Sequence, residues 1–228
     1  MDTVTLDKPA DWHAERALGI GGSDAKRVMG GDWHALWLEK TGRVEPEDLS
    51  DVLQVQLGTW TEPFNLHWFS RQTGKDVATG IAAVVSDDHP FMRCNLDGWC
   101  DPDGAVVEAK HVNAFDKPDT VVSRYYPQLQ HMMAVTGASV AYLTVIYGNN
   151  KWEWYQVEAD ADYIADLIER ERAFWWHVEN DVEPENPDAV QASISLDDMR
   201  EIDLDALEEA GEVWPNWAYE MQPELGTW

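Results

Sequence analysis

Residues 96–112 read LDGWCDPDGAVVEAKHV, and this stretch decides the fold. Apolar, aromatic and β-branched residues stand on both sides of the turn-forming residues 101–104, a pattern typical of two strands joined by a tight turn. Only one residue separates Glu108 from Lys110, so a strand presents both side chains on one face. If the loop has two residues, Asp97 lies directly opposite Glu108, with the Cβ atoms about 5 Å apart.

The facing carboxylates predict a metal site. Asp97 and Glu108 would repel each other unless a cation lay between them. Mg²⁺ and Mn²⁺ are hard cations that prefer oxygen ligands and retain water, and Lys110 could stabilise charge that develops on a substrate. A glycine bulge at Gly104 would shift the register by one residue, and an ordinary Glu–Lys surface pair is the competing interpretation. We favour the site, because these charges interrupt apolar strands.

Outside this hairpin, the hydrophobic pattern predicts helices first and strands later. Ser23 or Asp24 is a suitable N-cap for the helix that follows the glycine-rich segment. Thr61 is expected to restart a long helix, because Pro63 is tolerated in a first turn but not in an interior. The predicted helices are about 12–18, 24–29, 33–41, 51–73, 124–136 and 160–178, and the predicted strands are 81–86, 91–100, 105–112, 139–148 and 151–159. This order predicts an α/β fold with a mixed central β-sheet flanked by helices.

Charge is distributed unevenly along the 228 residues, whose net charge is -27. Residues 178–228 hold fifteen Asp and Glu against one Arg. We therefore predict a domain over 1–185 and an acidic, Trp-bearing C-terminal tail over 186–228. The domain is itself acidic, so any contact with a polyanion such as a nucleic acid would have to be local, and a saline environment would also favour such a surface.

The composition excludes several other classes of protein. No run approaches the ~20 apolar residues that span a bilayer, and no secretory signal is visible, so a cytoplasmic location is expected. Cys94 and Cys100 are too few for a disulfide scaffold or a four-cysteine metal site. Along one regular strand they share the face opposite Asp97, where they are expected to be core residues.

Several segments, taken in order, are similar to a known family. LDG (96–98) followed by VEAK (107–110) resembles the D…ExK core of the PD-(D/E)XK nucleases, with Leu96 where the name-giving proline stands. The further matching segments are RALGIGGSDA (16–25), LGTWTEP (57–63), YPQLQHMMAVTG (126–137) and VEADADYIADLIERERAFW (157–175). Their order and spacing resemble the YqaJ-type viral recombinases, the group that contains lambda exonuclease. The resemblance covers roughly residues 12–185 and implies the restriction-endonuclease-like fold of that superfamily.

The resemblance implies a metal-binding set and a catalytic lysine. Asp97 and Glu108 would be metal ligands, with the backbone carbonyl of Ala109 as a third. Glu62 would complete a second metal position, so two Mg²⁺ or Mn²⁺ ions are expected. Lys110 would be the catalytic lysine. Without the family, Glu62 would be read as an ordinary acidic residue at a helix start.

The same resemblance assigns supporting residues. Gln130 would assist at the active site, with Gln128 as its companion and Tyr126 as support on the Gln130 face. On a helix the two glutamines point about 200° apart, so at most one of them faces the metal. Arg16 and Ser23 match positions that contact a DNA phosphate, expected to be a 5′ phosphate. A glycine-rich helix start binds anions readily, although Ser23 could also be only an N-cap.

The expected function is therefore a metal-dependent DNA nuclease, acting as a 5′→3′ double-strand exonuclease in phage-type recombination. Its partners would be DNA and a single-strand-annealing or single-strand-binding protein, in the host cytoplasm if a phage encodes it. A structure-specific (branched or flap) or single-strand endonuclease of the same fold stays open, because basic residues are few. A non-catalytic acidic DNA mimic is disfavoured, because a mimic has no need for Lys110 within an apolar strand. Polarity, oligomeric state and the role of the tail are not determined by the sequence.

Overall fold

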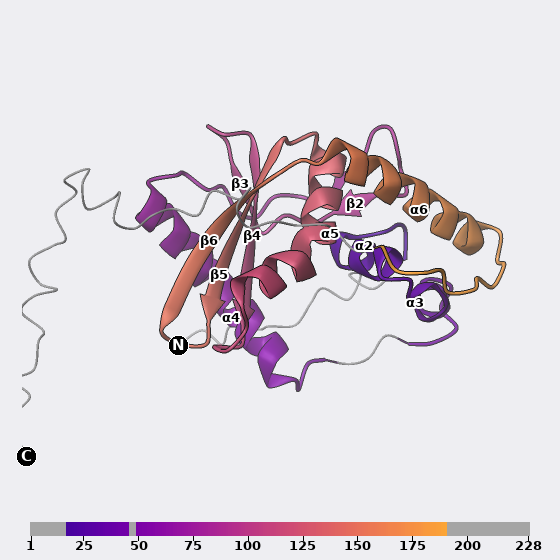
Figure 1. The fold of residues 1–228 in the computed structure, drawn as a ribbon, viewed down its shortest axis with the longest axis horizontal. Coiled ribbons are helices and arrows are strands. Elements are labelled where there is room, and N and C mark those ends of the chain that lie inside the picture. The colour runs from indigo at the N-terminus through magenta and orange to yellow at the C-terminus, as the bar shows by residue number, and fades with distance from the viewer. Residues whose placement is uncertain (1–16, 46–48, 191–228) are drawn as a thin grey trace, which may run out of the picture.

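A mixed four-stranded β-sheet forms the centre of the computed structural model, which describes residues 17–45 and 49–190 (Figure 1). Along the sheet the strands are β3 (Gly98–Cys100), β4 (Ala105–Val112), β5 (Val140–Tyr147) and β6 (Lys151–Glu158). β4 and β5 are parallel, and the other two pairings are antiparallel. The predicted mixed α/β class is confirmed.

Helices cover both faces of this sheet. They are α2 (Gly22–Met29), α3 (Trp33–Lys40), α4 (Leu53–Thr73), α5 (Pro118–Thr136) and α6 (Ala161–Glu179). Leu66 and Phe69 of α4 pack on the face that carries Val107, whereas α5 packs on the face that carries Val106. Figure 1 shows α2, α3 and α6 together at the opposite end of the molecule from β6. Successive residues of β4 therefore face different helices, as strand alternation requires.

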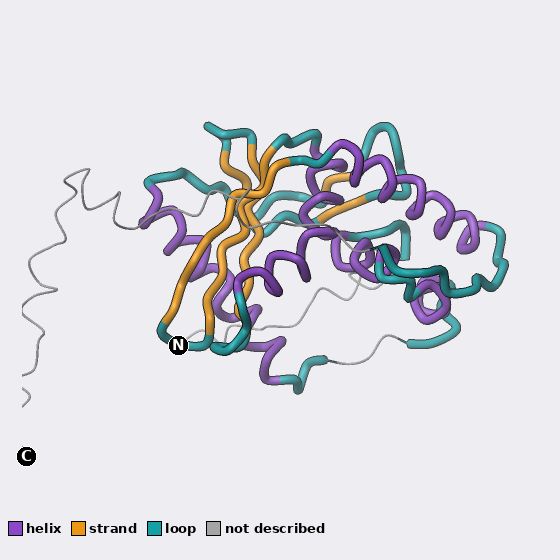
Figure 2. Tube along the Cα trace, in the orientation of Figure 1, coloured by secondary structure: helices purple, strands orange, loops and turns teal. Residues whose placement is uncertain are grey.

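The predicted strand 91–100 is wrong as a single element. It is divided into β2 (Arg93–Cys94), which pairs with β1 (Val84–Val85) in a separate two-stranded sheet, and β3 (Figure 2). Cys94 and Cys100 consequently do not share a face, and each belongs to a different buried cluster. The interruption places Asp97 immediately before β3, where its side chain can reach β4.

Two helix starts and one helix interior differ from the predictions. α4 continues through Pro63 without restarting at Thr61, because the packing of Leu66 and Phe69 outweighs the loss of one helical hydrogen bond. The N-cap of α2 is Gly21, and Asp24 instead accepts a hydrogen bond from the Gly21 N–H at 3.0 Å. α5 begins earlier than predicted, with a proline in its first turn. The predicted helix 12–18 lies almost entirely outside the described residues.

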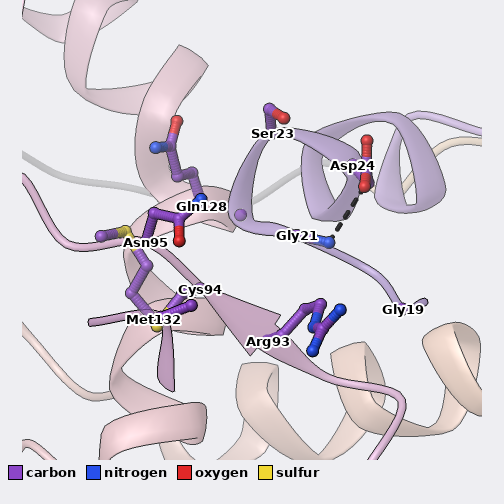
Figure 3. Close-up of a pocket in the computed structure, with 11 residues that line it drawn as sticks. Gly19, Gly21, Ser23, Asp24, Arg93, Cys94, Asn95, Gln128 and Met132 are labelled. Atoms are coloured by element: carbon purple, nitrogen blue, oxygen red, sulfur yellow. Dashed lines mark hydrogen bonds between the residues drawn. The ribbon is translucent and has the colours of Figure 1, made fainter. Parts of the chain in front are cut away.

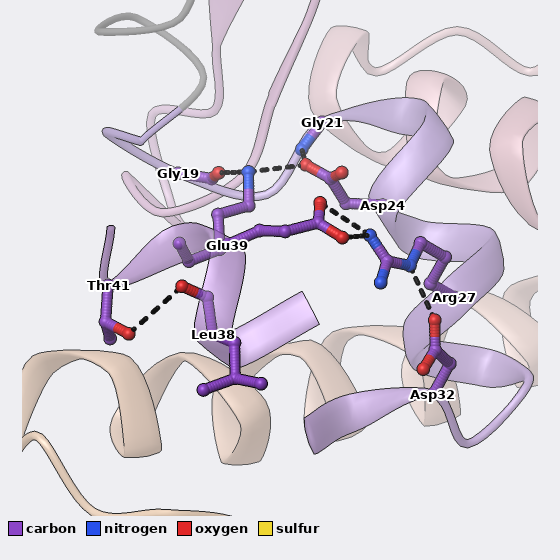
Figure 4. Close-up of polar contacts among 9 residues, drawn as sticks. Gly19, Gly21, Asp24, Arg27, Asp32, Leu38, Glu39 and Thr41 are labelled. Atoms are coloured by element: carbon purple, nitrogen blue, oxygen red, sulfur yellow. Dashed lines mark hydrogen bonds and ion pairs between the residues drawn. The ribbon is translucent and has the colours of Figure 1, made fainter. Parts of the chain in front are cut away.

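Buried polar contacts fix the glycine-rich segment that precedes α2 (Figure 4). The Lys40 ammonium binds the buried Asp24 carboxylate at 2.6 Å and the Gly19 carbonyl at 2.7 Å. Arg27 donates to Glu39 at 2.8 Å and to Asp32 at 2.7 Å. These contacts join α2 to α3 and hold the glycine-rich segment against both helices.

The chain returns to α2 and α3 after α6. The Asn186 side chain accepts the His34 N–H at 2.8 Å, and the Val190 N–H donates to the Met29 carbonyl at 2.9 Å. The remainder of the predicted acidic tail lies outside the described residues. Within residues 17–45 and 49–190, no helix is both long and apolar enough to cross a membrane.

A buried ion pair joins α5 to α6. His131 Nδ1 lies 2.8 Å from Glu171 Oε1, and Nε2 lies 2.9 Å from the Arg93 carbonyl, with both side chains fully buried. Burial lowers the pKa of His131, but the Glu171 carboxylate and the Arg93 carbonyl outweigh burial and raise that pKa overall. Burial also raises the pKa of Glu171, against the opposing charge of His131. The folded protein therefore holds this proton more tightly than the unfolded chain.

His131→Leu should lower the free energy of unfolding by about 3–5 kcal/mol near pH 6, because Glu171 loses its buried partner. The folded pKa of His131 lies above the ordinary value of 6.5, so this contribution is complete below 6.5 and is lost as pH rises through the folded pKa. Urea unfolding of wild type and His131→Leu from about pH 6 to about pH 9 should show that the difference in their free energies of unfolding becomes smaller as the pH rises. A difference that stays constant would contradict the ion pair.

Candidate active site

The β3–β4 hairpin brings Asp97 to β4. The connection is a four-residue turn rather than the predicted two-residue loop, but the register is the predicted one, with Gly98 opposite Val107 and no shift from a bulge. β3 pairs with β4 only as far as Val107, which leaves the next part of this edge of β4 without a strand partner. The Ala109 N–H therefore donates to Asp97 Oδ2 at 2.9 Å.

Glu108 is the buried centre of the site, with 2% of its surface exposed. Its Oε1 forms an ion pair with the Lys110 ammonium and accepts a hydrogen bond from Gln128 Nε2 at 2.6 Å. Its Oε2 is buried and has no hydrogen-bond partner. A buried carboxylate oxygen without a partner is costly, so this atom points to a further cationic or donating group in the working site.

The charges around Glu108 perturb one another. Burial raises the pKa of Asp97 well above its usual range, and the negative charge of Glu108 adds to this shift. Burial and Glu108 also raise the pKa of Glu62, the α4 residue predicted at the second metal position. Burial lowers the pKa of Lys110, but the nearby carboxylates outweigh burial and raise it overall. Three carboxylates thus lie around one ammonium ion, which is the electrostatic setting that a divalent cation stabilises.

These residues fit a hard divalent cation. Asp97, Glu108, Glu62 and the Ala109 carbonyl supply only oxygen donors, the type that Mg²⁺ and Mn²⁺ prefer. Within the described part of the chain, no three His, Cys, Asp or Glu side chains are gathered closely enough to hold a metal ion as they stand. Instead, the Lys110 ammonium is the cation beside Glu108.

The structure corrects the roles predicted for Gln130 and Tyr126. Gln130 is fully buried, donates to the Glu158 carbonyl at 2.8 Å and accepts from the Asp160 N–H at 2.9 Å. The Tyr126 hydroxyl donates to the Asp160 side chain at 3.1 Å. Both residues therefore join α5 to the start of α6, and their side chains do not contact Glu108. Only Gln128 faces the site, as the angle between the two glutamines on a helix allows.

Tyr125 is a site residue that the sequence interpretation missed. Its ring lies 5.1 Å from the Lys110 ammonium, in cation–π contact. Tyr125 precedes Gln128 by one helical turn, so the two share a face of α5. The three-residue spacing between Tyr125 and Gln128 was the feature of the sequence that could have identified Tyr125 as a site residue.

A cavity of about 160 Å³ adjoins the site (Figure 3). Its lining includes Ser23 and the glycine-rich segment on one side, and Arg93, Asn95 and Gln128 on the other. Gln128 also binds Glu108, so the cavity and the carboxylates share a wall. Ser23, which was predicted to contact a phosphate, lines this cavity, whereas Arg16 lies outside the described residues. Arg93 is the arginine that the structure puts in this lining.

Asn65 ties α4 to the sheet next to the site. It is 1% exposed and donates to the Lys110 carbonyl at 3.1 Å and to the Thr144 carbonyl at 3.0 Å. Its oxygen accepts from the Thr144 hydroxyl at 2.8 Å and from the Trp152 indole at 3.0 Å. Every hydrogen-bonding position of this buried amide is used. Glu62 lies one turn earlier on α4, so Asn65 positions its helix directly over Lys110.

Thr61 ties the same helix to β4 on the other side of Glu62. Its hydroxyl lies 3.1 Å from His111 Nδ1, and His111 Nε2 lies 2.6 Å from the Gly148 carbonyl. Two directional contacts therefore flank Glu62. Apolar packing alone has no preferred direction and could not set the position of Glu62 as narrowly.

The model of the YqaJ-like viral recombinase domain matches residues 11–139 of the chain. This chain belongs to the YqaJ-like viral recombinase domain family. The matched segment contains the carboxylates, Lys110 and Gln128, whereas β5, β6 and α6 follow it.

A curated relative of this YqaJ-like chain is the uncharacterized protein YqaJ of Bacillus subtilis (strain 168). The two are 31% identical over 175 residues, which cover 72% of this chain and 54% of the relative. The chain thus spans about half the length of that relative.

Solved structures share the fold of the YqaJ-like chain. An alkaline exonuclease (LHK-Exo) from Laribacter hongkongensis has a TM-score of 0.63 at 20% identity, over 77% of this chain and 95% of that chain. The same exonuclease has been solved in complex with dAMP. A putative exonuclease from Eubacterium rectale has a TM-score of 0.53 at 12% identity, over 86% of this chain and 98% of that chain.

Asn65→Leu should weaken Mn²⁺ binding by about 10-fold or more, because residues that hold metal ligands in place affect affinity on this scale. It should also lower stability by about 1–3 kcal/mol for the partners left unsatisfied. The measurements are calorimetric Mn²⁺ titration without DNA and urea unfolding.

Gln130→Leu is the matched control for Asn65→Leu, because it removes a buried amide that also bridges two elements but lies away from the site. It should cost similar stability and leave Mn²⁺ affinity within about threefold of wild type. Equal Mn²⁺ affinities in the two variants would show that Asn65 only stabilises the fold.

Proposed function

We propose that this protein hydrolyses DNA phosphodiester bonds with Mg²⁺ or Mn²⁺ bound by Asp97, Glu108 and the Ala109 carbonyl. Glu62 would serve a second ion. The observation that carries the proposal is the buried Glu108 carboxylate, which Lys110 and Gln128 share while one of its oxygens lacks a partner. Membership of the YqaJ-like family and the fold shared with exonucleases support the same activity.

Each side chain has a distinct part in this chemistry. When bound, a divalent ion would supply a Lewis acid that acidifies a coordinated water and stabilises a phosphate oxygen. The raised pKa of Lys110 keeps it protonated, so it acts as a donor to developing negative charge and not as a base. Gln128 orients the Glu108 carboxylate, and the Ala109 N–H orients Asp97.

We infer further that the enzyme is a 5′→3′ double-strand exonuclease of phage-type recombination. The cavity beside Gln128, lined by Ser23, Asn95 and Arg93, supports this mode because it is suited to a terminal 5′ phosphate next to the carboxylates. Arg16 would be a further contact to that phosphate. A single-strand-annealing or single-strand-binding protein would receive the product strand.

Cleavage of linear DNA should require Mg²⁺ or Mn²⁺ and stop in excess chelator, and Ca²⁺ should not support turnover.

Lys110→Ala should lower kcat by at least ~100-fold with little change in DNA binding, because it removes stabilisation of the transition state. Asp97→Asn and Glu108→Gln should abolish turnover. Robust cleavage in chelator, or a near-normal rate for Lys110→Ala, would overturn the proposed function.

A terminal phosphate should control the mode of cleavage. Wild type should degrade 5′-phosphorylated duplexes faster than 5′-hydroxyl duplexes and should spare closed circular DNA. Arg16→Ala should erase this preference and leave the chemistry intact, because an Arg–phosphate contact is charge-assisted and directional. Equal rates on both ends, together with cutting of circular single strands, would favour a structure-specific or single-strand endonuclease.

A further inference from the structure

Lys26 is a basic residue with other basic residues near it in an acidic chain, which has 16 Lys and Arg against 43 Asp and Glu. Most of the basic side chains that the structure describes form ion pairs with carboxylates: Arg27, Lys40, Arg43, Lys75, Lys110, Arg124, Lys151 and Arg172. Lys26 on α2 is exposed and forms no ion pair with a carboxylate of the described residues. Its surroundings are cationic instead.

Three cationic side chains gather around Tyr125. The Lys26 ammonium lies 5.9 Å from the centre of the Tyr125 ring, and the Lys110 ammonium lies 5.1 Å from it. Arg124 is adjacent to Tyr125 in the chain and donates to Asp116 at 2.9 Å. Partial burial of the otherwise exposed Lys26 side chain lowers its pKa, and the positive charges of Arg124 and Lys110 lower it further. Lys26 is therefore close enough to Arg124 and Lys110 to be repelled by both.

The Lys26, Arg124 and Tyr125 cluster and the cavity lie next to each other along the contact between α2 and α5. Gly22 lies so close to α5 that an added Cβ would be 3.1 Å from the Gln128 side chain. One turn along α2 from Ser23 is Lys26, and one turn back along α5 from Gln128 is Tyr125. The cavity, the Glu108–Lys110 pair and the cationic cluster thus follow one another along a single seam.

We propose that Lys26, Arg124 and Tyr125 form a binding site for a backbone phosphate of the DNA strand, next to the phosphate that is cut. This inference rests on the proposed function. A phosphodiester carries one negative charge and would offset the repulsion of Lys26 by Arg124 and Lys110. The Lys26 ammonium is a point charge that can bind a phosphate whatever the base sequence. Continuity of the cluster with Lys110 favours a phosphate within a strand over free phosphate. The site would let a chain of net charge -27 hold DNA locally.

The first test is the salt dependence of DNA binding. In the Asp97→Asn background, which should not turn over, affinity for a 5′-phosphorylated duplex is measured against KCl concentration. Lys26→Ala should weaken binding to all sequences equally and reduce the slope of log K against log salt by about 1. Lys26 is exposed, so the fold should persist, and Lys26→Gln should behave in the same way.

Lys151→Ala is the matched control. Lys151 also lies over a tyrosine ring, at 4.7 Å from Tyr147, but it is paired with Glu153 on β6. Its removal should leave both affinity and slope unchanged. If Lys26→Ala and Lys151→Ala behave alike, the phosphate site is wrong, whereas the nuclease proposal stands. If the Asp97→Asn protein binds no DNA at low salt, both proposals fail.

A second test locates the phosphate. Single phosphates of the duplex are replaced in turn by uncharged methylphosphonates, and the loss of affinity is recorded at each position. At one position beside the cleavage site, the methylphosphonate should weaken DNA binding by the Lys151→Ala protein but not by the Lys26→Ala protein. A double-mutant cycle gives this result when the residue and the phosphate are in direct contact. Equal sensitivity of the two variants at every position would overturn the assignment. Weakened Mn²⁺ binding by Lys26→Ala without DNA would also overturn it, since Lys26 would then act through Lys110.

Discussion

The hydrogen bond from the Ala109 N–H to the Asp97 carboxylate is the contact on which the site depends. It exists because β3 pairs with β4 only as far as Val107 and leaves the next N–H on that edge without a strand acceptor. The carboxylate satisfies that donor and is thereby held beside Glu108. A longer β3 would have paired this edge with backbone and turned Asp97 away.

The same part of β4 concentrates charge in a buried place. Glu108 is almost completely buried, and its ion pair with Lys110 and its hydrogen bond from Gln128 offset only part of the desolvation cost. Burial raises the pKa values of Asp97 and Glu62, and the negative charge of Glu108 raises both further. Such an arrangement is unfavourable for stability alone, which is typical of a site arranged for binding and catalysis.

Three positively charged side chains lie together in one place in this acidic protein, around Tyr125. Lys26 lies near Lys110 and Arg124 around one tyrosine, and within the described residues Lys110 and Arg124 are paired with Glu108 and Asp116, whereas Lys26 forms no such ion pair. The overall charge would disfavour long-range attraction of DNA, but short-range contacts are screened less and act at the seam between α2 and α5. Net charge therefore says little about what this seam can bind.

The sequence by itself determined the α/β class, the hairpin register and the proximity of Asp97, Glu108 and Lys110. These features follow from turn chemistry and from strand periodicity, which act over neighbouring residues. Only the tertiary structure decided that Gln128 and not Gln130 faces the site, because the choice depends on how α5 is rotated over the sheet. The roles of Tyr125 and Asn65 follow from the same packing, and so does the unbroken path of α4 through Pro63. Contacts between distant segments set these features, and no local pattern encodes them.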